Sequence, residues 1–238
     1  MIYQTRGIVL HRTVFADNKA MFHIYTVRDG MCSYMAYLSL KKERKSQWVK
    51  MQPLTVVELK AERKREGAAD YLKSVEIGRQ PGVPVFDYLK SSVKMFLNEL
   101  LYKILQSAPP DESLFRFVED SLLEFEREKF VPDFHLRFLW RLTRHLGCVP
   151  QSDYSESRPY FYLEAACFSP VKRQTDKLLS EWIHRMASSD GPLVCPEEVL
   201  PSALRAPMLD CLLSYYSQHV SSVVSGVQSH KVLKEMLR

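Results

Sequence analysis

The hydrophobic period of the sequence changes near residue 82, and this change constrains the fold more than any other feature. Before it, apolar residues alternate over short runs that are rich in β-branched and aromatic side chains, at residues 6–12, 20–28, 31–40, 53–61 and 70–77. In the fourth run Val57, Leu59 and Ala61 share one face, as in a strand with one solvated side. Asp29-Gly30 separates the second run from the third and is typical of a tight hairpin. Five short strands without room for crossover helices predict a small closed antiparallel β-barrel, of which the OB-fold is one form.

Beyond the turn-forming residues 80–84, apolar residues recur at spacings of three and four, which is typical of amphipathic helices. The pattern predicts helices over residues 85–106, 112–129, 134–147, 172–187, 203–219 and 231–237. Asp111 is placed to cap the second of them. We interpret residues 151–170 as a polar loop with a short aromatic strand at 160–164. The fold class predicted is therefore α+β, with an N-terminal OB-fold barrel in residues 1–80 and a mostly helical C-terminal domain in residues 81–238.

The composition is that of a folded globular chain, with 46% hydrophobic and 26% charged residues. No run approaches the roughly 18 apolar residues of a membrane span, and the first residues lack the apolar stretch of a signal peptide. The five cysteines are scattered, at Cys32, Cys148, Cys167, Cys195 and Cys211. We therefore expect reduced thiols, no membrane association and a cytoplasmic location.

Catalytic and metal-binding motifs are missing from the sequence. Neither Gly-x-Ser-x-Gly nor Gly-x-x-x-x-Gly-Lys occurs. Glu124, Glu126 and Glu128 alternate on a predicted helix, so we interpret them as a solvated face. His135 and His145 stand ten residues apart, too far to share a metal on one helix, and no two cysteines are spaced as a zinc pair. We predict no catalytic residue, no metal, no cofactor and no small-molecule substrate, and an enzyme is the third and least favoured interpretation.

Positive charge is concentrated in the first third of the chain. Residues 1–80 hold 15 Lys and Arg against 8 Asp and Glu, a net charge of +7, whereas the remainder has a net charge of −2. Two basic clusters, Lys41 to Lys45 and Arg63 to Arg65, fall in predicted loops of the barrel. Clustered cations favour the binding of phosphates through counterion release. An exposed aromatic residue such as Trp48 or Tyr37 can stack on an unpaired base. The predicted DNA-binding residues are Arg6, Lys41, Lys42, Arg44, Lys45, Trp48, Lys50, Arg63, Lys64 and Arg65. The alternative is that both clusters are solubilising hairpin tips.

A second constellation lies in the third predicted helix. Arg137, Arg141 and Arg144 share one face, while apolar residues cover most of the rest. One interpretation is the edge of a pocket that binds an acidic, apolar peptide. The alternative is internal pairing with Glu99, Glu124 or Asp133.

Several short motifs together resemble the RecO family of recombination mediators, the bacterial DNA repair proteins of the RecF pathway. The N-terminal ones are residues 5–10, Tyr25-Thr26 before Gly30, Gln52-Pro53-Leu54 and Val57-Glu58-Leu59; the C-terminal ones are residues 98–101, Leu114-Phe115, residues 138–147 and residues 229–233. The resemblance covers nearly the whole chain.

The resemblance implies an OB-fold that binds single- and double-stranded DNA on the nucleoid, without enzymatic turnover. It also implies annealing of complementary strands, binding of the partner RecR, and loading of recombinase onto DNA coated by single-strand-binding protein. The acidic C-terminal tail of that protein would bind the helical domain, with Arg137 our first choice as its contact. The runner-up interpretation is a protein-only adaptor whose basic barrel does not bind DNA.

The sequence departs from the family pattern between Cys148 and Cys167. Many relatives carry two close cysteine pairs for zinc between the positions of Cys148 and Cys167, where this chain keeps only those single cysteines. We therefore predict that the segment near residues 148–170 is a reduced insertion without zinc.

Overall fold

The structure is a computed structural model that describes residues 1–16, 19–37, 51–63, 69–78 and 87–237. The chain forms two compact units. The first comprises Met1–Phe86 and Lys94–Leu123, and the second comprises Asp87–Val93 and Glu124–Arg238. The predicted domain division between residues 80 and 81 stays a prediction.

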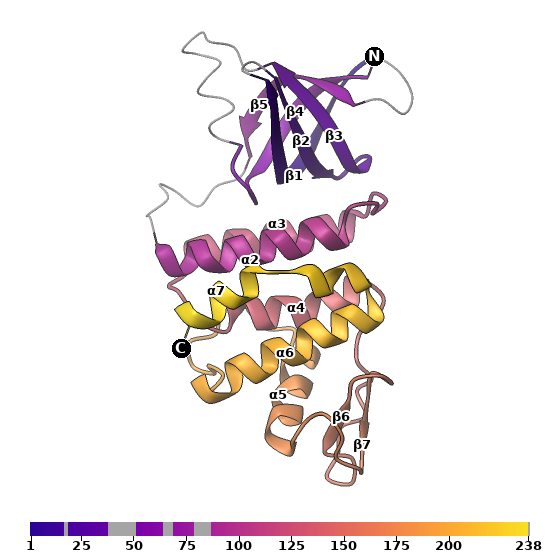
Figure 1. Ribbon diagram of the computed structural model, residues 1–238, viewed down its shortest axis with the longest axis vertical. Helices are drawn as coiled ribbons and strands as arrows, with labels where there is room; N and C mark the ends of the chain where they lie inside the picture. Colours follow the sequence, from indigo (N-terminus) through magenta and orange to yellow (C-terminus); the bar gives the residue numbers. More distant parts are fainter. Residues whose placement is uncertain (17–18, 38–50, 64–68, 79–86, 238) are drawn as a thin grey trace. The chain divides into compact units, whose positions relative to one another are not determined.

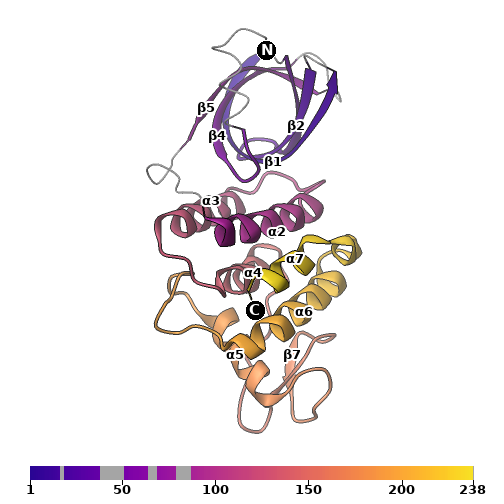
Figure 2. The same cartoon turned by 60° about the vertical axis from the view of Figure 1, so that its left-hand side comes forward.

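The first unit is built on a closed β-barrel, and the ring of strands is visible in Figure 2. Its strands are β1 (Ile2–Ala16), β2 (Lys19–Thr26), β3 (Gly30–Tyr37), β4 (Val56–Glu62) and β5 (Asp70–Ile77). Around the ring the order is β1-β2-β3-β5-β4. The α+β class with an N-terminal barrel and helices after it is confirmed (Figure 1).

One detail of the predicted barrel is wrong, because its strands are not all antiparallel. Strands β3 and β5 run parallel, with Tyr34 opposite Asp70 and Met35 opposite Tyr71. A closed ring with an odd number of strands cannot alternate direction at every step. The parallel pair is therefore a consequence of closing five strands into a barrel.

Strand β1 is longer than the alternation in the sequence predicted. Its first half pairs with β4 from Ile2 to Ile8, and its second half pairs with β2 from Gly7 to Ala16. The register shifts after Val9 and again after Val14. These irregularities break the period of two in the second half of the strand, and so they concealed its C-terminal end from the sequence pattern.

The barrel interior holds the residues that alternation predicted. Val57, Leu59 and Ala61 of β4 are buried, whereas Glu58 and Lys60 between them are exposed. They pack in a core with residues of the other strands, including Val9, Phe22, Ile24, Tyr34, Ala36 and Val75.

The hairpin between β2 and β3 requires glycine. Gly30 has a φ of 69°, and a Cβ there would lie 2.4 Å from the carbonyl oxygen of Ala108. The next residue, Met31, donates its N–H to that same oxygen at 3.1 Å. Gly30 thus has a left-handed backbone conformation, and the turn contacts the segment around Ala108, which joins two helices of this unit.

Those helices are α2 (Tyr88–Ile104), of which residues 94–104 belong to the first unit, and α3 (Glu112–Arg127), whose residues 112–123 do. Asp111 caps α3 as predicted, because its Oδ1 accepts the N–H of Leu114 at 3.0 Å. The ring of Phe115 on α3 stacks on Tyr25 of β2, with centroids 6.5 Å apart. This contact attaches the helix to the barrel.

The second unit contains the remaining elements, which are α4 (Phe134–His145), β6 (Tyr160–Tyr162), β7 (Cys167–Ser169), α5 (Lys177–Ser188), α6 (Ser202–His219), the 3-10 helix η1 (Ser222–Gly226) and α7 (Ser229–Met236). Strands β6 and β7 form a small antiparallel hairpin, where only the first strand was predicted. Trp140 of α4, Phe161 of β6 and Tyr215 of α6 are buried together, with ring centroids 5.4 to 5.9 Å apart. No helix in the described ranges is long and apolar enough to span a membrane.

Candidate nucleic-acid interface

The predicted DNA-binding residues divide into two groups. Eight lie outside the described residues: Lys41, Lys42, Arg44, Lys45, Trp48, Lys50, Lys64 and Arg65. Arg6 on β1 and Arg63 just after β4 are described. Both carry internal ion pairs.

Arg6 joins the barrel to a helix of the same unit. Its Nη1 lies 2.7 Å from Oε2 and 2.9 Å from Oε1 of Glu119 on α3. The carbon of the guanidinium is also 5.3 Å from the ring centroid of Phe115. Glu119 is buried, so the charge of Arg6 compensates a carboxylate that would otherwise be costly to desolvate.

Arg63 belongs to a polar network that includes Asp70, at the place where β3 and β5 close the barrel. Its Nη2 lies 3.1 Å from Oδ2 of Asp29, and its Nε lies 3.3 Å from Oδ2 of Asp70. Arg28 completes the pairing, with its Nε 3.7 Å from Asp29. Two cations therefore meet two carboxylates, which leaves this part of the network electrically balanced.

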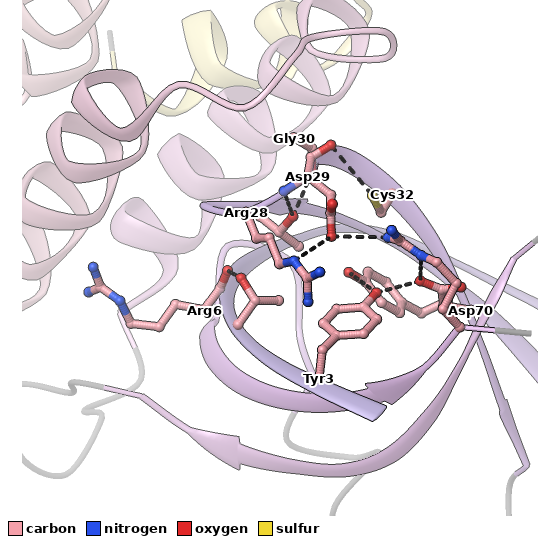
Figure 3. A network of polar contacts seen from close by, with 11 residues as sticks. Tyr3, Arg6, Arg28, Asp29, Gly30, Cys32 and Asp70 are labelled. Atoms are coloured by element: carbon pink, nitrogen blue, oxygen red, sulfur yellow. Dashed lines mark hydrogen bonds and ion pairs between the residues drawn. The ribbon is translucent and has the colours of Figure 1, made fainter. Parts of the chain in front are cut away.

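Tyr3 is the centre of that network, as Figure 3 shows. Its hydroxyl donates to Asp70 and lies 3.3 Å from the hydroxyl of Tyr34. The guanidinium carbons of Arg28 and Arg63 lie 4.4 and 5.2 Å from the centroid of its ring. Burial, and next the hydrogen bond to Asp70, raise the pKa of Tyr3 to about 12, so the phenol keeps its proton and remains a donor.

Three outward-facing residues of the barrel form a cluster that the sequence did not predict as a group. Lys19 of β2 lies directly opposite Tyr37 of β3, and its Nζ is 5.6 Å from the centroid of the tyrosine ring. The rings of Tyr37 and Tyr71 are stacked, with centroids 6.0 Å apart and planes inclined by 20°. Tyr37 was noted from the sequence as an exposed aromatic, but its partners depend on barrel registers that no local pattern contains.

The excess positive charge of the first 80 residues is unevenly placed. Eight of the 15 Lys and Arg, but only three of the eight Asp and Glu, lie outside the described residues. Within the described residues of this region the two signs nearly balance. The charge that favours a polyanion therefore belongs mainly to segments 38–50 and 64–68, which flank Tyr37 and Tyr71 in the sequence.

The predicted arginine stripe lies on α4 of the second unit. Arg137, the first choice for an acidic ligand, is buried, and its Nε lies 3.3 Å from Oδ2 of Asp133. It also donates to the carbonyl oxygen of Glu198, and its Nη1 is 3.8 Å from the Glu198 carboxylate. This geometry corresponds to the alternative of internal pairing.

The other two arginines of the stripe are engaged differently. Arg144 pairs with the exposed Asp190 and donates to the carbonyl oxygen of Ala187 at 2.6 Å. Arg141 donates from Nη2 to the hydroxyl of Ser189 at 3.2 Å and to the carbonyl of Pro192 at 3.4 Å, and its buried Nε has no hydrogen-bond partner. Burial, and next the charge of Arg144, lower the pKa of Arg141.

Glu124 and His135 of this unit can be compared with their interpretation from the sequence. Glu124, predicted on a solvated face, instead accepts the N–H of Val194 at 2.7 Å. An acidic run on a helix cannot reveal such a contact, because its partner lies 70 residues away. His135 is buried, as a structural histidine would be.

No metal centre is assembled within the described ranges. They contain no group of three or more His, Cys, Asp or Glu side chains that could hold an ion. Burial raises the pKa of Cys148, and raises that of Cys211 to about 12, which favours the protonated thiol over the thiolate that zinc requires.

The geometry thus defines an OB-barrel protein with an attached helical region. Residues 1–80 match the family described as Recombination protein O N terminal, and residues 85–158 match Recombination protein O C terminal. The chain belongs to the RecO family, whose members act in DNA repair and recombination.

Curated relatives extend the match over the chain. It is 26% identical to the DNA repair protein RecO of Flavobacterium psychrophilum over 245 aligned positions, which cover 99% of each protein. It is 31% identical to the DNA repair protein RecO of Phocaeicola vulgatus over 175 positions, 72% of each protein, and 30% identical to that of Bacteroides fragilis over 176 positions, which cover 73% of this chain and 72% of the relative.

Proposed function

We propose that this protein is a recombination mediator that binds single- and double-stranded DNA through its basic barrel. The protein anneals complementary strands that are bound to the barrel. Together with RecR, it helps to load recombinase onto DNA coated by single-strand-binding protein. These steps require no turnover by the chain itself, and they would take place on the nucleoid in the cytoplasm.

The observation that carries the proposal is the net charge of +7 over residues 1–80. An OB barrel with cationic loops is suited to a nucleic-acid backbone, because each phosphate contact releases condensed counterions. Arg6 and Arg63 already neutralise carboxylates. We therefore assign the main phosphate contacts to Lys41, Lys42, Arg44 and Lys45, and further contacts to Lys64 and Arg65.

The direct test removes the first cluster. We expect the variant with Lys41, Lys42, Arg44 and Lys45 replaced by alanine to bind oligonucleotides about tenfold or more weakly, and equally so for all sequences, because phosphate contacts carry no base information. The matched control removes the same amount of charge from exposed positions of the second unit, at Lys129, Lys172, Arg173 and Lys177. Equal losses of affinity in both variants would mean that the effect comes from net charge and not from contacts of the first cluster. Absence of DNA binding by the wild type would favour the protein-only adaptor.

We also propose that the helical region binds the acidic C-terminal tail of single-strand-binding protein, and that Arg141 is its principal contact. Among the residues described, Arg141 has no carboxylate within ion-pair distance, whereas Arg137 has two and Arg144 has one. A cation that is partly desolvated and without a counter-ion gains more from an incoming carboxylate than one already paired.

A labelled tail peptide tests this assignment. Arg141→Ala should weaken peptide binding by about thirtyfold, the equivalent of about 2 kcal/mol, with little change in melting temperature. Arg116→Ala is the control, because Arg116 is an exposed helical arginine that pairs with Glu112 one turn away. Undiminished peptide affinity in Arg141→Ala would remove Arg141 from the site.

A further inference from the structure

The outward face of strands β2 and β3 ends in a small aromatic surface. Side chains alternate along β3, so that Tyr34 and Ala36 point into the barrel while Met35 and Tyr37 point outward. Met35 lies opposite Tyr71 of β5 in the parallel pair, and Tyr37 lies opposite Lys19 of β2. The registers of two different strand pairs therefore bring Lys19, Tyr37 and Tyr71 to one place on the barrel wall.

The rings are arranged so that a third flat group could be added. Tyr37 and Tyr71 are nearly parallel, with an angle of 20° between their planes, and Tyr37 is 50% exposed. A tyrosine ring that is held by stacking and is still half exposed offers π-surface to solvent at little entropic cost. The hairpin between β1 and β2 adds the exposed apolar side chains of Val14 and Phe15 to the same strand ends.

One cation lies beside this surface in space, and others are close to it in the sequence. Lys19 holds its ammonium group 5.6 Å from the Tyr37 ring. In the sequence, Lys41 follows Tyr37 by four residues and Arg65 precedes Tyr71 by six. Each basic cluster is therefore within a few residues of one of the two tyrosines in the sequence.

We propose that Tyr37 and Tyr71, with Lys19 beside them, are the stacking site for an unpaired base, and that this site makes the barrel prefer single-stranded over duplex DNA. The inference rests on the proposed DNA-binding function. A base in a duplex already stacks on its neighbours inside the helix and cannot offer its face without being flipped out, whereas a base in a single strand can. Lys19 then contacts the phosphate next to the stacked base. Phosphates are present in both single-stranded and duplex DNA.

The test separates base from backbone. Binding of the whole chain to three labelled substrates is measured by fluorescence anisotropy. The substrates are a thymidine strand of about 20 nucleotides, an abasic strand of equal length, and a duplex. The strand is longer than the roughly 4–16 nucleotides that one OB barrel covers. Tyr37→Leu should weaken binding to the thymidine strand by about fivefold or more. Its affinities for the abasic strand and the duplex should stay within about twofold of the wild type, because neither offers a free base.

Two further variants keep the result interpretable. Tyr37→Phe retains the ring and should bind all three substrates like the wild type, whereas Tyr88→Leu removes a tyrosine that is 61% exposed on α2 and should have no effect. A Tyr37→Leu loss that is equal on the abasic strand, or no loss on any substrate, would overturn the stacking site while leaving DNA binding intact. A wild-type protein that binds none of the three would overturn the proposed function together with this inference.

Discussion

Arg137 and Asp133 form an ion pair one helical turn apart on α4, with Nε and Oδ2 separated by 3.3 Å and side chains that are 4% and 0% exposed. Removing one member of a buried pair leaves the other charge without compensation. We therefore expect Arg137→Ala to lower the free energy of unfolding by about 3 kcal/mol or more, measured by denaturant titration. The pair between Arg116 and Glu112 has the same spacing but is exposed to solvent, so Arg116→Ala should cost about 0.5 kcal/mol or less. Similar costs for the two variants would contradict the structural role of Arg137.

His135 makes the stability depend on pH. Burial, and next the charge of Arg205, lower the pKa of His135 from 6.5 to about 3. Because the folded-state value is the lower one, the unfolded chain takes up a proton as the pH falls below about 6.5, and the folded chain does not. Stability contributed by neutral His135 is therefore complete above that pH and is lost progressively on acidification.

Comparison of two pH values isolates this contribution. Between about pH 7.5 and about pH 5, the wild type should lose about 2 kcal/mol more of its unfolding free energy than His135→Gln does. Parallel losses in the two proteins would show that His135 is not held neutral in the folded chain.

Tyr3 should stabilise the closure of the barrel through its hydroxyl. Tyr3→Phe keeps the ring under Arg28 and Arg63 but removes a donor from the buried Asp70. We expect a loss of about 1–3 kcal/mol in unfolding free energy, since a buried carboxylate then lacks one of its hydrogen bonds. The exposed Tyr88 is the comparison, and a Tyr3→Phe variant as stable as Tyr88→Phe would refute this role.

Purified protein should contain no stoichiometric zinc, and a chelator should leave its melting temperature unchanged. A structural zinc site takes thiolates in close pairs, and the sequence has no such pair. Metal analysis that finds one zinc per chain would disprove the prediction.

The sequence predicts those parts of the fold that depend on local pattern. The buried face of Val57, Leu59 and Ala61, the left-handed Gly30 and the cap at Asp111 all follow from residues close together in the chain. The parallel meeting of β3 and β5 does not, because closure of a ring is a property of the whole barrel.

The candidate site was harder to predict for the same reason. Charge density identified the basic clusters, but the ion pair of Arg6 with Glu119 spans 113 residues, and the stacking of Tyr37 on Tyr71 requires the register of a strand pair that is not adjacent in sequence. Helical spacing likewise placed Arg137, Arg141 and Arg144 on one face without indicating which of them already has a carboxylate partner.

The salt dependence of single-stranded DNA binding tests the central claim, that the barrel holds a nucleic-acid backbone through its cationic segments. If about four lysines and arginines meet phosphates, a plot of log affinity against log salt concentration should have a slope of roughly −3, since each contact with a single strand contributes about −0.7. Replacement of Lys41, Lys42, Arg44 and Lys45 by alanine should make the slope clearly less negative, because the main phosphate contacts are then lost. A wild-type slope near zero would contradict the account.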